Sequence, residues 1–171
     1  VSQVIELTPQ NFDQVVMQPD KHVVVAFYAP WCGYCKKMAP TYDRGAKLFA
    51  NDVVFARVDA HKYFENYGHK YDIEGYPTLM LFPKITGGDV VVEKQPILYD
   101  LQSEELSGLV TFLNERAGTN RDSHGFPNDQ AGLIESFTQL ATQFVGADGA
   151  EARDKIIEEA KSALENVEES A

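Results

Sequence analysis

The chain has 171 residues, and its composition, 44% hydrophobic and 11% aromatic, is that of a chain able to build a core. A formal net charge of -11 argues against partners that require a basic surface, so neither nucleic acid nor a membrane is expected to bind. No apolar run approaches the roughly 18 residues of a membrane span, and no signal peptide or retention signal is visible at the ends.

The first part of the chain alternates between strand and helix patterns. Residues 22–29 are nearly all apolar and rich in β-branched side chains, which predicts a central strand covered on both faces. From Cys32 onwards apolar side chains recur at three- and four-residue steps, which predicts a helix. In chain order, the elements predicted up to residue 59 are a strand at 4–7, a helix at 8–18 capped by Thr8, the strand at 22–29, the helix from Cys32 and a strand at 53–59.

Beyond residue 59 the alternation continues and ends in two consecutive strands. The predicted elements are a short helix at 61–69, a strand at 78–82, a strand at 90–92 after a turn at 87–88, and a helix opened by Ser103. The order is therefore β-α-β-α-β-α-β-β-α. The early alternation implies parallel pairing of strands and helices on both faces of a sheet, which is an α/β fold.

A polar loop at residues 118–127, with two glycines and one proline, predicts a boundary between two parts of the chain. Residues 1–118 carry 11 basic and 15 acidic side chains, whereas the shorter part at 119–171 carries 4 and 11. Apolar residues at helical spacing predict two amphipathic helices in this second part, separated by residues 146–149. Two helices alone make a poor core, so we expect them to pack on the first part, on another chain or on further helices.

The chain has only two cysteines, Cys32 and Cys35, and they lie where the predicted strand at 22–29 gives way to a helix. A helix start offers unpaired N–H groups and a partial positive charge, which stabilise a thiolate, and the thiolate is the nucleophile in disulfide exchange. A second thiol one turn later can resolve the mixed disulfide. We therefore expect redox chemistry, with Cys32 as the more exposed nucleophile and Cys35 as the shielded resolving thiol.

The cysteine pair has two other interpretations. A static disulfide or a buried thiol pair is one, although a bridge between such close positions closes too small a loop to stabilise the fold much. A zinc site is the other, but four ligands are usual and the chain has no second cysteine pair, so no metal is expected. The histidines show no ligand spacing and are interpreted as surface or capping residues: His22, His61, His69 and His124.

Residues 27–40, which run Phe-Tyr-Ala-Pro-Trp-Cys-Gly-Tyr-Cys-Lys-Lys-Met-Ala-Pro, closely resemble the catalytic module of protein disulfide isomerases. Residues 58–60 resemble the end of that family's third strand, and residues 71–78 resemble its cis-proline loop. The resemblance covers residues 1–118 and implies a thioredoxin-like catalytic domain there, with a mixed sheet flanked by helices. Residues 119–171 resemble the start of the all-helical D domain found in some isomerases.

The resemblance implies roles for the residues around the dithiol. Gly33 and Tyr34 complete the active-site loop together with Trp31, which we interpret as a flat apolar wall beside the sulfurs, with ordinary core packing as the alternative. Tyr76 and Pro77 are expected to bind substrate. The peptide bond between them is expected to be cis, and the backbone of Tyr76 is expected to pair with an extended client peptide.

Four positions depart from the family pattern. Tyr34 replaces the usual histidine between the cysteines, whose charge favours the thiolate. Ala26 replaces a buried glutamate that moves protons to and from the resolving thiol, Arg57 replaces the lysine that faces this glutamate, and Ser103 stands where the family has a mobile arginine. We therefore expect a more stable disulfide and slower turnover than in a usual isomerase, with a reduction potential below roughly −180 mV.

The sequence thus predicts a thiol-disulfide oxidoreductase or isomerase of the endoplasmic reticulum lumen, a compartment that follows from the resemblance alone. Its expected partners are unfolded or disulfide-containing client proteins, with glutathione or an upstream thiol oxidase as a further partner. No cofactor is needed, because electrons pass through sulfur. Two alternatives stay open: a plain thioredoxin-like reductase, and a chaperone or escort in which the thiols are secondary.

Overall fold

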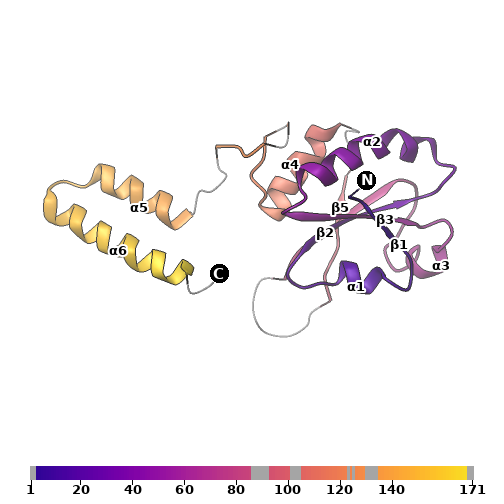
Figure 1. Ribbon diagram of the computed structural model, residues 1–171, viewed down its shortest axis with the longest axis horizontal. Coiled ribbons are helices and arrows are strands. Elements are labelled where there is room, and N and C mark those ends of the chain that lie inside the picture. The colour runs from indigo at the N-terminus through magenta and orange to yellow at the C-terminus, as the bar shows by residue number, and fades with distance from the viewer. Residues whose placement is uncertain are drawn as a thin grey trace. The chain divides into compact units, whose positions relative to one another are not determined.

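The computed structural model describes residues 3–85, 93–100, 105–122, 124, 126–129 and 135–168. The chain divides into two compact units, Val1–Asp129 and Gln130–Ala171 (Figure 1), and each is considered by itself. The boundary that the sequence predicts after residue 118 thus lies before the division between the units.

The first unit is built on a five-stranded mixed sheet in the order β1-β3-β2-β4-β5. Strands β1, β3 and β2 are parallel, whereas β4 is antiparallel to β2 and β5 is antiparallel to β4. The strand bounds are β1 (Ile5–Leu7), β2 (His22–Tyr28), β3 (Val53–Asp59), β4 (Thr78–Phe82) and β5 (Ile97–Tyr99). The parallel pairing expected from the early alternation is confirmed.

Most strands agree with the sequence prediction, but the last one does not. Strands β3 and β4 have the predicted bounds, and β2 ends one residue earlier than predicted. Strand β5 was missed, because it has only three residues and all of them are apolar, which leaves no alternating sequence pattern to detect. The predicted strand at 90–92, the turn at 87–88 and Ser103 lie outside the described residues.

Four helices pack on the sheet, and two of them are shorter than predicted. Their bounds are α1 (Phe12–Val16), α2 (Gly33–Leu48), α3 (Phe64–Tyr67) and α4 (Leu106–Ala117). The prediction that Thr8 caps a helix at 8–18 is wrong. The Asn11 side chain instead accepts a hydrogen bond from the Thr8 backbone N–H at 2.7 Å, which holds residues 8–11 in a turn, and the helix begins after Asn11.

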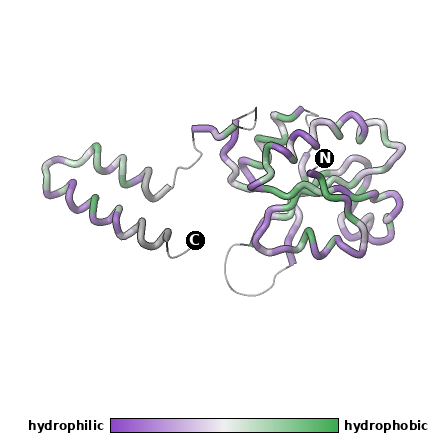
Figure 2. The backbone as a smooth tube through the Cα atoms, viewed as in Figure 1, coloured by the Kyte–Doolittle hydropathy of each residue, from purple (hydrophilic) through white to green (hydrophobic). Residues whose placement is uncertain are grey.

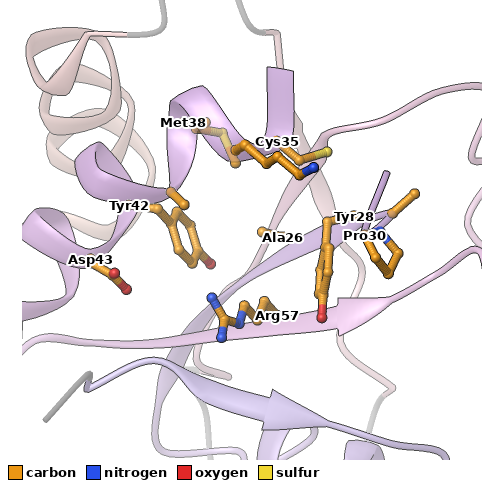
Figure 3. Close-up of a pocket in the computed structure, with 11 residues that line it drawn as sticks. Ala26, Tyr28, Pro30, Cys35, Met38, Tyr42, Asp43 and Arg57 are labelled. Carbon is orange, nitrogen blue, oxygen red and sulfur yellow. The ribbon is translucent and has the colours of Figure 1, made fainter. Parts of the chain in front are cut away.

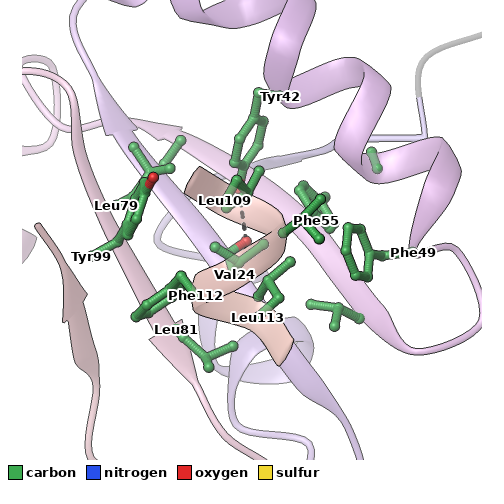
Figure 4. Close-up of a cluster of buried hydrophobic side chains, with 14 of the residues drawn as sticks. Val24, Tyr42, Phe49, Phe55, Leu79, Leu81, Tyr99, Leu109, Phe112 and Leu113 are labelled. Atoms are coloured by element: carbon green, nitrogen blue, oxygen red, sulfur yellow. Dashed lines mark hydrogen bonds between the residues drawn. The ribbon is translucent and has the colours of Figure 1, made fainter. Parts of the chain in front are cut away.

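The sheet is covered on both faces, with α2 and α4 on one side and α1 and α3 on the other (Figure 1). Successive residues of β2 point to opposite faces, so Val24 packs under α2 and α4 while Val25 packs toward α1. Figure 4 shows the first of these cores, in which the Tyr42 hydroxyl lies 2.9 Å from the Val24 carbonyl oxygen. Hydrophobic residues accordingly concentrate along the central strands (Figure 2), which confirms the α/β class.

The segment that follows α4 belongs to the first unit. Gly118 ends the helix with a φ of 66°, in the left-handed region that favours glycine. The Asn114 side chain accepts a hydrogen bond from the Arg121 backbone N–H at 2.9 Å, and the Arg121 guanidinium forms an ion pair with Asp52 and lies over the Phe49 ring. These contacts tie the loop after Gly118 to the sheet domain.

The second unit is a pair of helices, α5 (Glu135–Gly146) and α6 (Ala150–Glu168). The break predicted at 146–149 is confirmed, and Gly149 there has a φ of 93°. Among the large hydrophobic side chains that the structure describes in these helices, Phe144, Val145 and Ile157 are exposed. Within the described residues, no helix combines the length and hydrophobicity that crossing a membrane requires. That residues 119–171 form the start of a D domain stays a prediction.

Candidate active site

The two cysteines lie where β2 ends and α2 begins, and a disulfide joins them. Cys32 is the N-cap of α2 and has an extended backbone, and its sulfur accepts a hydrogen bond from the Cys35 backbone N–H at 3.1 Å. The helix start therefore points an N–H donor at the Cys32 sulfur, as the sequence predicts. This local arrangement favours negative charge on Cys32 once the disulfide is reduced.

The expected difference in exposure between the cysteines is absent from the disulfide form. Cys32 is 5% exposed and Cys35 is 7% exposed, so the expectation that Cys32 is the more exposed of the two is wrong for this state. What separates them is their surroundings. Cys32 lies beside the loop that precedes β4, with its sulfur 3.4 Å from the Tyr76 carbonyl oxygen, whereas Cys35 lines a cavity under α2.

Aromatic side chains surround the sulfurs on the outer surface. Trp31 is 64% exposed, which excludes core packing and leaves the interpretation as a wall beside the dithiol. Its ring makes edge contacts with His61 and Tyr76, at centroid distances of 5.5 and 6.0 Å. Tyr34 is 63% exposed, and the Lys37 ammonium lies 5.3 Å from its ring centroid. The site therefore presents apolar rings around a sulfur pair that is itself buried.

The Tyr76–Pro77 peptide bond is cis, as the resemblance implies. The Thr78 side chain donates a hydrogen bond to the Gly75 carbonyl oxygen at 2.7 Å, which ties the two ends of this short loop together. Tyr76 packs partly buried against the cluster of Ala29 and the two cysteines. The structure thus brings the predicted binding residues and the dithiol together in one place. Gly33 is the first residue of α2, and a Cβ there would contact nothing within 4 Å.

Arg57 has a partner that the sequence did not reveal. Its Cα pairs with Ala26 of β2 on one side and with Glu6 of β1 on the other, so all three residues lie in one row across the sheet. The Arg57 Nε donates to a Glu6 carboxylate oxygen at 2.7 Å, and the Tyr28 hydroxyl donates to the other oxygen at 2.8 Å. Burial, together with the hydrogen bond to Glu6, raises the pKa of Tyr28 to about 12. Glu6 was missed because its role depends on the pairing of β1 with β3, which no local pattern encodes.

Candidate metal ligands do not cluster in the described part of the chain. No group of three or more histidine, cysteine or acidic side chains there is placed to hold an ion. His61 contacts Trp31, and the His22 Nδ1 accepts a hydrogen bond from the Lys84 backbone N–H at 3.2 Å. These contacts agree with the interpretation of the histidines as surface or capping residues.

Comparison with known families and solved structures identifies the fold that carries this site. The family model described as thioredoxin matches residues 3–101, which is more than half of the chain. Among solved structures, the chain is similar to the Trx4 domain of ERdj5, with a TM-score of 0.57 and 28% identity over 67% of this chain and 96% of that domain. It is also similar to the first thioredoxin domain of mouse protein disulfide-isomerase A4, with a TM-score of 0.52 and 29% identity over 70% of this chain and 76% of that one. The first unit therefore has the thioredoxin fold, as expected.

Curated relatives identify the class of protein more closely than the fold does. The chain is 43% identical over 170 residues to protein disulfide isomerase-like 2-1 of Oryza sativa and 41% identical over 154 residues to a probable protein disulfide-isomerase A6 of Medicago sativa. A protein disulfide-isomerase 1 of Dictyostelium discoideum matches at 36% over 172 residues. These alignments cover 98%, 89% and 98% of this chain but only 42%, 40% and 45% of the relatives.

The chain belongs to the protein disulfide isomerase family, as its resemblance implied. It spans less than half the length of these three relatives.

Proposed function

We propose that this protein exchanges disulfides with folding client proteins through Cys32 and Cys35. The observation that carries the proposal is the geometry of Cys32, whose sulfur accepts the Cys35 N–H at the start of a 16-residue helix and lies 3.4 Å from the Tyr76 carbonyl oxygen. The first contact stabilises a thiolate. The second places the attacking sulfur beside the backbone of Tyr76, against which a client strand can align.

The exchange balances in sulfur atoms and electrons. In the reducing direction the Cys32 thiolate attacks a client disulfide, forms a mixed disulfide and releases one client thiolate. The Cys35 thiolate then attacks the Cys32 sulfur and displaces the second client thiolate, so two electrons pass from the dithiol to the client. The reverse sequence oxidises the client, and isomerisation follows when the released client thiolate attacks elsewhere in the same chain.

The client is held by apolar and backbone contacts rather than by charge. Trp31 and Tyr34 are exposed in the segment that carries the cysteines, and the ring of Tyr76 contacts that of Trp31. Exposed aromatic rings next to the backbone of Tyr76 suit extended, partly unfolded peptides with apolar side chains. This surface supports disulfide-containing unfolded proteins as the substrate class.

The cellular setting belongs to the same proposal. An oxidising compartment is needed to return the dithiol to the disulfide, and we infer the endoplasmic reticulum lumen, with glutathione or a thiol oxidase as the oxidant. No cofactor takes part in this scheme. The apolar stripes of α5 and α6 are a candidate interaction module.

Refolding of scrambled ribonuclease tests the proposal when it is run alongside a glutathione redox titration. Recovery of ribonuclease activity that requires both cysteines supports an isomerase. Reduction of insulin disulfides without recovery of ribonuclease supports the reductase alternative, which the neutral Tyr34 and the uncharged Ala26 favour. Suppression of aggregation that survives Cys32→Ser with no exchange activity would identify a chaperone and refute the proposed function.

A further inference from the structure

The segment that carries the dithiol also presents Trp31, the only tryptophan in the chain. Pro30 and Cys35 from this segment line the cavity under α2 (Figure 3), whereas the Trp31 ring lies on the outer surface and is exposed. An exposed ring that is free to change rotamer loses that freedom when a client packs on it, which weakens binding by about two- to tenfold. How well Trp31 binds a client therefore depends on what holds its ring.

Two aromatic rings from other segments hold the Trp31 ring. The His61 ring, which follows β3, lies at a centroid distance of 5.5 Å and an interplanar angle of 86°, and the Tyr76 ring, which precedes β4, lies at 6.0 Å and 79°. Both arrangements are edge-to-face, the geometry that aromatic rings prefer, and each such contact changes an equilibrium constant by about two- to tenfold. The contacts are thus strong enough to offset the freedom that they remove.

The backbone on both sides of His61 is fixed by hydrogen bonds. The Ala60 N–H donates to the Tyr28 carbonyl oxygen at 2.9 Å, which ties the end of β3 to the end of β2. On the other side, the Lys62 N–H donates to the Asp59 carboxylate at 2.9 Å. Neither bond uses the imidazole, so the sheet places this side chain, and its replacement leaves both bonds intact.

The two rings beside Trp31 differ in what else they contact. Tyr76 is partly buried and packs against the cluster that contains both cysteines, so its ring also supports the dithiol. His61 is exposed, and Trp31 supplies the one ring that it contacts among the described residues. A change at His61 therefore acts on the Trp31 ring without altering the packing around the sulfurs.

We propose that His61 is a positioning residue that holds the Trp31 ring in place and thereby favours client segments with an aromatic side chain beside the reacting cysteine. The inference rests on the proposed function, because it concerns which clients the exchange reaches. The client ring packs on a Trp31 ring that is already ordered, while the sulfur chemistry at Cys32 is unchanged. His61 thus acts on the binding of the client and not on the exchange step.

Fluorescence anisotropy decay measures the ordering of the Trp31 ring directly, because the chain has no other tryptophan. His61→Ser should increase the amplitude of the sub-nanosecond motion of this ring. His61→Phe keeps a ring at the position and should restore the decay of the parent. An unchanged decay in His61→Ser would overturn the proposal. A decay in His61→Phe equal to that in His61→Ser would overturn it as well, because the imidazole would then act by charge or hydrogen bonding.

Exchange kinetics with reduced glutathione as the electron donor test the effect on clients. The probes are a disulfide peptide with phenylalanine beside its cysteine, the same peptide with glycine there, and bis(2-hydroxyethyl) disulfide. For the phenylalanine peptide, His61→Ser should raise KM by about two- to tenfold and leave kcat unchanged, and His61→Phe should restore KM. The other two probes should react alike with parent and variants. Equal slowing with all the probes would overturn the proposal.

A matched control lies elsewhere in the same chain. His69 makes the same kind of edge contact with the Phe64 ring, at a centroid distance of 5.4 Å, and His69→Ser should change neither the motion of Trp31 nor KM. Changes as large as those in His61→Ser would show that losing any surface histidine has this effect, and would overturn the proposal. Failure of the parent to exchange with any probe would instead refute the proposed function, and the anisotropy decay would still decide whether His61 orders Trp31.

Discussion

The two sides of the dithiol differ in how far they follow the family. On the side of Cys32, the helix start, the cis Tyr76–Pro77 bond and the wall of Trp31 match what the family resemblance implies. On the side of Cys35, a cavity lies where the resemblance leads one to expect a carboxylate. Under the proposed function, the attacking half of the site follows the family pattern and the resolving half departs from it, so we expect the difference to show in the second step of exchange.

The largest expected effect distinguishes the roles of the two cysteines in exchange. Cys32→Ser should reduce exchange to background, because no other thiolate lies at the helix start. Cys35→Ser should still attack clients but should trap them as mixed disulfides, because no internal thiol resolves them. Non-reducing gel electrophoresis after rapid alkylation checks both. Trapped complexes in Cys32→Ser rather than in Cys35→Ser would reverse the assignment of nucleophile and resolving thiol.

The next effect concerns the redox balance. We expect a reduction potential below about −180 mV, since Tyr34 gives the Cys32 thiolate no positive neighbour. Tyr34→His should raise the potential by about 30 mV, which is a tenfold change in the equilibrium constant of a two-electron couple. A glutathione titration measures this shift.

Tyr34→Phe is the control for that experiment, because it keeps the ring and the neutral charge and should leave the potential unchanged. A parent potential at or above about −180 mV would contradict the predicted stability of the disulfide. An equal shift in both variants would show that the ring, and not charge, sets the potential.

A third effect concerns the cavity side directly. Ala26→Glu places a proton carrier beside Cys35 and should speed the release of mixed disulfides about tenfold or more at neutral pH. Ala26→Gln has nearly the same size and cannot carry the proton, so it should not accelerate release. Stopped-flow measurement of release compares the two. Equal rates in parent and Ala26→Glu would count against proton transfer as the slow event.

The smallest effect concerns the two cores on the faces of the sheet, with Tyr42 in one and Tyr67 in the other. The Tyr42 hydroxyl lies within 2.9 and 2.7 Å of the Val24 and Ala56 carbonyl oxygens, so Tyr42→Phe should lower the free energy of unfolding by about 1–3 kcal/mol. The buried Tyr67 hydroxyl finds no partner among the described residues, and Tyr67→Phe should therefore change stability by less than about 1 kcal/mol. Urea unfolding of both variants checks the contrast, and a larger loss in Tyr67→Phe would contradict it.

Whether a feature could be predicted from the sequence depends on how far apart along the chain the interacting residues lie. Strands β3 and β4 and the start of α2 depend on local apolar runs and on the cysteine motif, and the sequence located them. Strand β5 is too short to carry a pattern, and α1 is shortened by the Asn11 side chain. The ion pair between Glu6 and Arg57 could not be predicted from a local pattern, because it joins residues 51 positions apart through the pairing of β1 and β3.

The features of the candidate site divide in the same way, into those carried by local segments and those that depend on distant contacts. The sequence located the dithiol, the aromatic wall and the cis-proline loop, all of which are carried by short continuous segments. It did not show that the two cysteines are equally buried in the disulfide form, nor that Arg57 lies between Glu6 and Ala26. The first feature arises from the packing of α2 on the sheet and the second from the pairing of β1, β3 and β2, and a linear pattern contains neither.

The most direct test is the alkylation of Cys32 in the reduced Cys35→Ser protein, followed from pH 4 to pH 9. Because Cys32 caps α2, we expect its thiolate to persist below neutral pH and its reaction with iodoacetamide at pH 7 to be at least about tenfold faster than that of free cysteine, whose pKa is about 8.5. A rate no greater than that of free cysteine, with a midpoint near 8.5, would show that the helix start does not activate this sulfur.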